Sequence, residues 1–109
     1  MGDGVKMKKV YLHIYDIVLS EISGDDNLKI VDYMENVEQA KNEYPLQMRF
    51  YKKSINGIVN PIEKIINGLD REDIKMAAGI TQNDSLFEKL YKVAGLDLME
   101  DNGFNIFRQ

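Results

Sequence analysis

Few side chains in this sequence could do chemistry. The 109 residues include one histidine and no cysteine, which excludes disulfides and thiolate metal sites. His13 could serve as a metal ligand or general base, and Asp16 is close enough in sequence to orient its ring. Since there is no second histidine, carboxylates would have to complete any metal site. We therefore expect His13 to be a surface or boundary residue without a bound metal.

The familiar short motifs of catalysis and ligand binding are missing. Asp25, Asp26 and Asn27 suggest calcium ligands, but the spacing of a calcium-binding loop is absent. The pattern instead indicates a turn and a helix cap. No glycine-rich phosphate loop and no serine nucleophile motif occurs. Acidic residues between Asp32 and Glu43 could do acid–base work only in a cleft. We predict that the protein is not an enzyme and holds no cofactor. A small enzyme or ligand carrier that uses His13 remains an alternative, ranked after the two binding functions described below.

One short segment combines bases with aromatic side chains. Arg49, Phe50, Lys52 and Lys53 surround Tyr51, a mixture that can contact acidic groups or stack on nucleotides. Tyr51 falls in phase with the apolar residues of its element and is expected in the core. The other four are candidate binding residues, and a solvated helix face is the alternative.

Composition and charge indicate one small soluble domain. The formal net charge is −4, which argues against non-specific nucleic-acid binding. The charge is uneven, because residues 20–44 carry seven acidic residues against two lysines, whereas residues 45–69 carry four basic residues against one glutamate. No apolar run is long enough to span a membrane, and the lack of cysteine suits the cytoplasm. We expect a flexible tail at 1–4 and one globular domain at 5–109.

These residues must be positioned by local elements, which the spacing of apolar residues predicts to be mainly helical. Over 5–22 the residue types favour strand, but the spacing of three and four favours a helix, which is the prediction adopted. A second helix should end near Glu43, before Pro45. The next apolar run predicts one kinked helix or two helices, at 46–57 and 60–68. Further helices are expected at 71–79 and 84–94. Asn102-Gly103 predicts a terminal β-hairpin pairing 96–100 with 104–108.

The order of elements over residues 70–109 resembles a winged helix-turn-helix. A short helix, a turn at Gly79, a second helix and a hairpin follow one another, as in proteins of that class. The resemblance implies a DNA-binding regulator with its contacts on the second of these helices. The residues placed there to meet DNA are Asn83, Ser85, Lys89 and Lys92.

Together these patterns predict a compact, mainly α domain, a bundle of five to six helices with a C-terminal β-hairpin. Short length, missing chemistry and many aromatic and methionine residues favour a small regulatory, adaptor or inhibitor protein that binds another protein. A homodimer formed through the apolar helix 5–22 is one hypothesis. The DNA-binding regulator is the runner-up, so nucleic acid is a possible partner that is not favoured, and a membrane is not expected.

Overall fold

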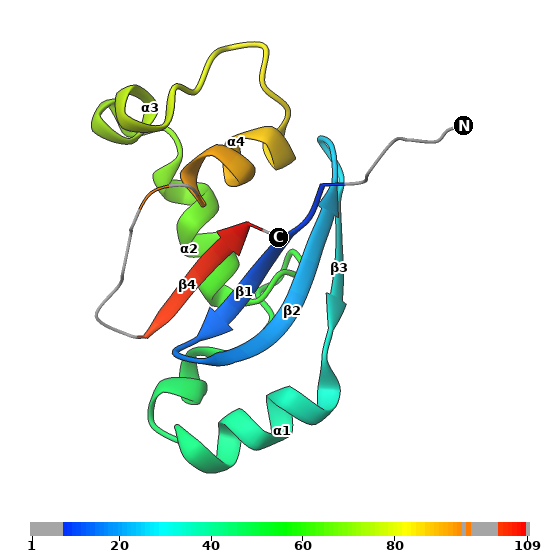
Figure 1. Ribbon diagram of the computed structural model, residues 1–109. Coiled ribbons are helices and arrows are strands. Elements are labelled where there is room, and N and C mark those ends of the chain that lie inside the picture. Colours follow the sequence, from blue (N-terminus) through cyan, green and yellow to red (C-terminus); the bar gives the residue numbers. More distant parts are fainter. Residues whose placement is uncertain (1–7, 95, 97–102, 109) are drawn as a thin grey trace.

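The protein is organised around an antiparallel sheet with the strand order β3–β2–β1–β4. The structure, a computed structural model, describes residues 8–94, 96 and 103–108. The strands are β1 (Val10–Ile14), β2 (Ile17–Gly24), β3 (Leu28–Asp32) and β4 (Phe104–Arg108). The helices are α1 (Met34–Glu43), α2 (Asn60–Gly68), α3 (Glu72–Ala78) and α4 (Leu86–Val93), with a 3₁₀ turn η1 (Gln47–Phe50) after α1. In Figure 1, α2, α3 and α4 lie to one side of the sheet and α1 lies at its lower end.

The mainly helical bundle is therefore the wrong fold class. Over the described part of the chain, four strands and four α-helices form a mixed α and β fold. None of the helices in that part is long and apolar enough to cross a membrane. The expected flexible tail at 1–4 lies outside the described residues.

The predicted helix at 5–22 is wrong, because its described part forms the β1–β2 hairpin. Strand-favouring residue types prevail here over apolar spacing. Tyr15 and Asp16 make the two-residue turn, and Tyr15 has a positive φ of 50°, as the favoured hairpin turns require. A bulge lies opposite Leu12 and His13, so that Leu19 and Ser20 are adjacent and both buried. The bulge shifts the alternation of buried and exposed residues by one position. The apolar residues on its two sides therefore show steps of three and four, which resemble the spacing of a helix.

The second and third predicted helices are only partly correct. Residues before α1 form β3, and α1 ends at Glu43, one residue before Tyr44-Pro45, as predicted. No α-helix forms over 46–57. There, η1 is followed by an irregular segment whose one bridge pairs Lys53 with Val59. Asn56-Gly57 turns the chain, with Gly57 at φ +77°, which prevents helix continuation.

The three later helices confirm their predictions. Pro61 lies in the first turn of α2, where its missing N–H costs no hydrogen bond. Gly79 ends α3 in the left-handed conformation. Ser85 caps α4 by accepting a hydrogen bond from the Glu88 N–H at 3.2 Å.

Only the second strand of the predicted terminal hairpin can be compared with the structure. Residues 104–108 do form a strand, and β4 pairs with β1 in a register that places Ile106 opposite Leu12. Residues 97–100, which were expected to form its hairpin partner, lie outside the described residues. A wing is a hairpin that extends from the helices. Since β4 belongs to the central sheet, the winged-helix order is not the fold.

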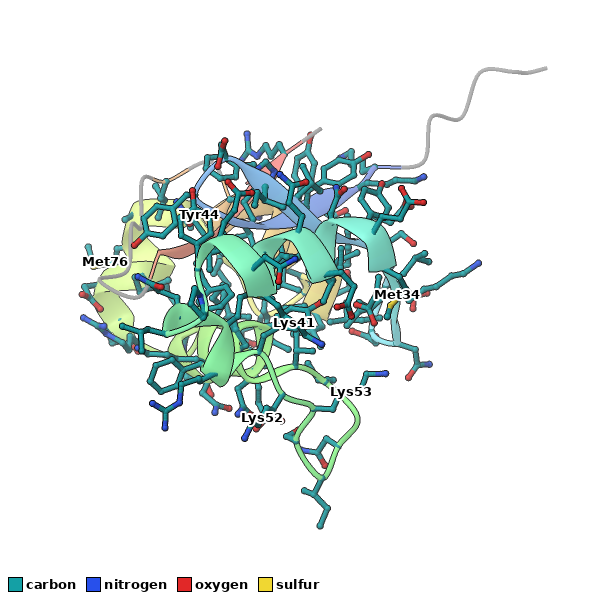
Figure 2. All side chains as sticks on the ribbon, turned by 90° about the horizontal axis from the view of Figure 1, so that it is seen from below. Met34, Lys41, Tyr44, Lys52, Lys53 and Met76 are labelled. Atoms are coloured by element: carbon teal, nitrogen blue, oxygen red, sulfur yellow. The ribbon has the colours of Figure 1, made fainter. Side chains whose placement is uncertain are left out.

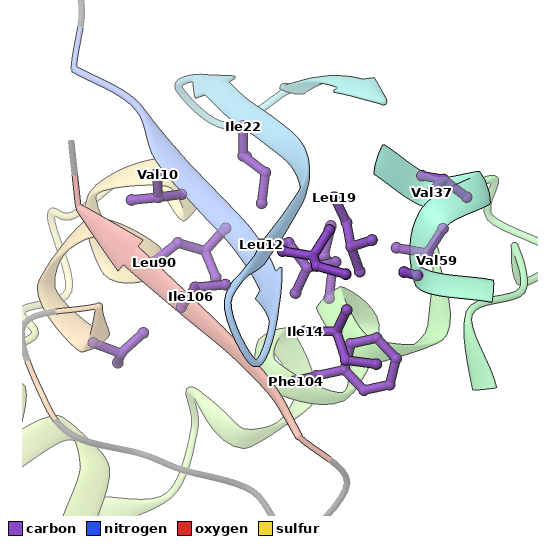
Figure 3. Packing of buried hydrophobic residues seen from close by; sticks show 14 of the residues in the cluster. Val10, Leu12, Ile14, Leu19, Ile22, Val37, Val59, Leu90, Phe104 and Ile106 are labelled. Atoms are coloured by element: carbon purple, nitrogen blue, oxygen red, sulfur yellow. The ribbon is translucent and has the colours of Figure 1, made fainter. Parts of the chain in front are cut away.

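The core lies between this sheet and the helices. Alternate residues of β1 are fully buried, and Figure 3 shows them beside side chains of β2, β4 and α4. Val37 of α1 and Val59, which precedes α2, extend the cluster toward Leu19. The buried members of β1 are Val10, Leu12 and Ile14. Tyr11 and His13 alternate with them and so face the opposite side of the sheet.

Candidate protein-binding surface

The four basic and aromatic residues singled out in the sequence lie together on the connection between α1 and α2. Arg49 and Phe50 end η1, and 60% of the Phe50 surface is exposed. Lys52 and Lys53 follow and are also exposed. Figure 2 shows both lysines on this connection, seen from the side of the molecule that carries Lys41 of α1. Tyr51, between them, turns inward as expected. Its ring stacks near Phe104 and its hydroxyl donates to the Asp32 carboxylate at 3.0 Å.

Ile55 extends this group and was missed, because its spacing matched the core residues around it. Its side chain is fully exposed, at 101% of the reference area. It occupies the tip of a tight turn, in which the Ser54 N–H donates to the Ile58 carbonyl at 2.8 Å. The signal that could have placed it outside the core is Asn56-Gly57, a turn dipeptide directly after it. We name Arg49, Phe50, Lys52, Lys53 and Ile55 the basic-loop surface.

The turn that carries Ile55 is held by side chains as well as by backbone. Glu63 of α2 accepts a hydrogen bond from the Ser54 hydroxyl at 2.6 Å and one from the Asn56 amide at 3.3 Å. The Ser54 hydroxyl also accepts from the Asn56 N–H at 3.2 Å. A loop tied in this way to a helix loses little conformational entropy when it meets a partner.

The charged side chains of the basic-loop surface are all positive. Within the described residues, neither Arg49, Lys52 nor Lys53 forms an ion pair. The neighbouring Lys41 pairs with Glu38 at 3.6 Å. The segment is therefore a positive site on a protein whose formal net charge is −4.

His13 is placed for packing and lacks a chemical partner among the described residues. Its ring meets Phe107 edge to face at a centroid distance of 4.5 Å, and burial lowers the pKa of His13. Asp16, its expected partner, instead accepts a hydrogen bond from the Tyr44 hydroxyl at 3.2 Å. No group of three or more histidine and carboxylate side chains in the described ranges could hold a metal ion.

The residues expected to contact DNA are partly used inside the protein. Ser85 caps α4, and the ammonium of Lys92 binds the Asp84 carboxylate at 2.6 Å and the Gly79 carbonyl at 3.0 Å. Asn83 is exposed, and Lys89 is half-buried. These four side chains do not form a common basic surface, because two of them hold the α3–α4 connection together.

The described residues also line a cavity of about 330 Å³, partly open to solvent, between α2, α3, α4 and β4. It was not predicted, because its walls come from segments far apart in the sequence. The apolar side chains that line it are Ile65, Leu69, Ile74, Val93 and Ile106. Polar groups at the same cavity belong to Lys64, Asn67, Arg71 and Asn105.

Comparison with known proteins does not assign the chain to a group. No family model matches it, and no curated protein or solved structure is significantly similar to it.

Proposed function

We propose that this protein is a small non-enzymatic binding protein, which acts by docking its basic-loop surface onto an acidic surface of another protein. The observation that carries the proposal is the fully exposed Ile55 at the tip of a hydrogen-bonded turn. Isolated exposed apolar residues are common on protein surfaces. Here the residue is held in place by Glu63 and flanked by two lysines without ion pairs in the described structure.

An anchor of this kind suits an apolar pocket on the partner. The energy of protein association is concentrated in a few residues that become fully desolvated in such pockets. Ile55 and Phe50 are the exposed apolar groups available, and the hydrogen bonds that hold the Ile55 turn limit the entropy lost on binding. The surrounding bases then set orientation and encounter rate rather than most of the affinity.

The charge of the basic-loop surface selects the chemistry of the partner. Arg49, Lys52 and Lys53 would be repelled by a basic surface and steered toward an acidic one. The same residues could meet nucleic-acid phosphates. No geometric feature favours that runner-up, since Ser85 and Lys92 are used internally. Duplex DNA is therefore kept as an outcome of the test. The absence of cysteine fits our proposal that the protein works in the cytoplasm.

The structure removes the argument from which the homodimer was predicted, although the homodimer can still be tested. It relied on apolar residues of 5–22 being presented by a helix. Val10, Leu12 and Ile14 of β1 are instead fully buried within a single chain. Sedimentation velocity at high concentration measures whether the chain associates with itself, and a monomer would exclude the homodimer.

The test compares surface variants in quantitative affinity purification from the native host. Ile55→Ser removes the anchor, and Lys52→Glu with Lys53→Glu reverses the charge. Met76→Ser is the matched control for the first, because Met76 is 82% exposed on α3. Lys29→Glu with Lys75→Glu is the control for the second. We expect the same protein to be retained by wild type and both controls, and to fall about tenfold in both test variants, as loss of a binding hot spot predicts.

The results can contradict the proposal in two ways. Equal retention by all variants, or no protein retained by wild type above an unrelated bait, would mean that the basic-loop surface is not the docking site. If instead wild type shifts duplex DNA in a salt-sensitive way and the double lysine variant does not, the partner is nucleic acid. Thermal unfolding of each variant confirms that the fold is intact.

A further inference from the structure

We propose that the cavity between α2, α3, α4 and β4 is a binding site for a small carboxylate with an apolar body. The site is separate from the basic-loop surface and independent of the proposed docking function. Its volume of about 330 Å³ lies at the lower end of the range of ligand pockets, about 300–1,000 Å³. A cavity of about 150 Å³ is enough for benzene, so this one suits a ligand of about ten non-hydrogen atoms.

The apolar part of the ligand would lie against side chains that are already shielded from solvent. Leu69, Val93 and Ile106 all line the cavity and are less than 5% exposed. Leu69 directly follows α2, and the other two lie in α4 and β4. The wall is therefore part of the packed core, while exposed residues such as Asn67 and Arg71 line the side of the cavity that is open to solvent.

Asn105 also lines the cavity and is only 8% exposed. Its side-chain oxygen accepts a hydrogen bond from the Ile106 N–H at 2.9 Å. The register of β4 places Asn105 opposite His13, so its side chain belongs to the sheet face that His13 occupies. The polar end of the ligand is therefore assigned to another residue of the wall.

The charge of Arg71 favours an anionic oxygen over a neutral one. Arg71 lines the cavity, and no carboxylate is among the residues identified at its wall. Arg71 binds Asp73 through Nε and one terminal nitrogen, at 3.2 and 2.7 Å. The other terminal nitrogen makes no hydrogen bond to a described residue, and it gives Arg71 a second face for a carboxylate. An alkylammonium ligand would meet like charge instead.

The test uses octanoate, which has ten non-hydrogen atoms, and two probes of equal chain length, octan-1-ol and octylammonium. Titration of the full chain, followed by calorimetry and by amide chemical shifts, should show saturable one-to-one binding of octanoate. Octan-1-ol should bind about tenfold more weakly, since it lacks the charge-assisted hydrogen bonds, and octylammonium should not bind.

Variants then locate the site. Arg71→Met should weaken octanoate about tenfold and leave octan-1-ol unchanged. Gly68→Leu should block both ligands. Gly68 lines the cavity, and a Cβ at this position meets no atom within 4 Å, so the added side chain has room without disturbing α2. Arg49→Met, the same change on the basic-loop surface, is the control and should bind octanoate as wild type does.

Three results would overturn the proposal. They are non-saturable octanoate binding, equal binding of octylammonium, and an octanoate affinity that Arg71→Met and Gly68→Leu leave unchanged. Neither variant alters a buried residue, because Arg71 is exposed and a Cβ on Gly68 would meet no atom.

Discussion

His13 and Ile55 differ from the roles that their positions in the sequence suggest. His13 has no chemical partner among the described residues, and Ile55 is not in the core. The one histidine packs against Phe107 on the face of the sheet away from the core, and the isoleucine projects fully into solvent. The His13 imidazole is partly buried and resists protonation, because desolvation disfavours its charged form. We therefore expect His13 to make the stability of the fold depend on pH.

The stability of the fold should fall as the pH is lowered from 7 toward 5.5. The pKa of His13 is lowered in the folded state, so the unfolded chain, with a pKa of about 6.5, binds the proton first. The free energy of unfolding then decreases below about pH 6.5 until the folded state also binds the proton. His13→Gln should flatten this part of the profile, measured by urea unfolding at several pH values. Since no other histidine is present, equal slopes for both proteins would contradict the assignment.

Among the elements, the start of β4 is joined to the β1–β2 hairpin by a close backbone approach. The Tyr15 N–H donates to the Gly103 carbonyl at 3.0 Å. A Cβ on Gly103 would lie 2.6 Å from the Tyr15 ring, and Gly103 has φ +84°. Only glycine combines this dihedral with so close an approach. The contact connects the hairpin turn to a strand almost ninety residues later in the chain.

Two glycine substitutions separate the dihedral from the contact. Gly57→Ala has a similar φ of +77° but open space around its Cβ, so it should cost about 1 kcal/mol of unfolding free energy. Gly103→Ala also places its methyl group against the outer atoms of the Tyr15 ring, a half-exposed side chain that must move, and should cost about 2 kcal/mol. Denaturant unfolding measures both. A smaller loss for Gly103→Ala than for Gly57→Ala would show that the approach of β4 to the turn is looser than described.

At the scale of the whole molecule, β1 is the centre of the fold. It pairs with β2 on one side and β4 on the other, and its inward side chains meet residues of the helices. The residues of β1 therefore contact both the N-terminal hairpin strand β2 and the C-terminal strand β4. The basic-loop surface and the cavity lie on elements that this core holds in place.

Leu12→Ala should be among the most damaging single substitutions. Leu12 is fully buried, and removing a buried leucine side chain costs about 2–5 kcal/mol. Val31→Ala, on edge strand β3 with 43% of Val31 exposed, is the control and should cost less than about 1 kcal/mol. Chemical denaturation compares the two variants. Similar losses for both would argue against β1 as the centre of the core.

Local chemistry in the sequence was enough to predict several features. Gly79 ends α3 and Tyr44-Pro45 follows the end of α1, as predicted, because caps and proline positions depend on residues within one helical turn. The exposure of Arg49, Phe50, Lys52 and Lys53 also followed from their place outside the apolar run. The candidate cavity did not follow, since its walls come from four separate elements.

The tertiary structure decided the strands and their partners. Asp26 was interpreted as a cap for the next helix, but its carboxylate accepts from the Leu86 N–H of α4 at 3.2 Å, sixty residues away. The bulge near Leu12 hid the alternation of β1 and β2, and β4 found its partner at the other end of the chain. Strand pairing satisfies backbone groups through distant residues, so the sequence of one segment determines its residue types and turns, while the sheet is determined only when all segments meet.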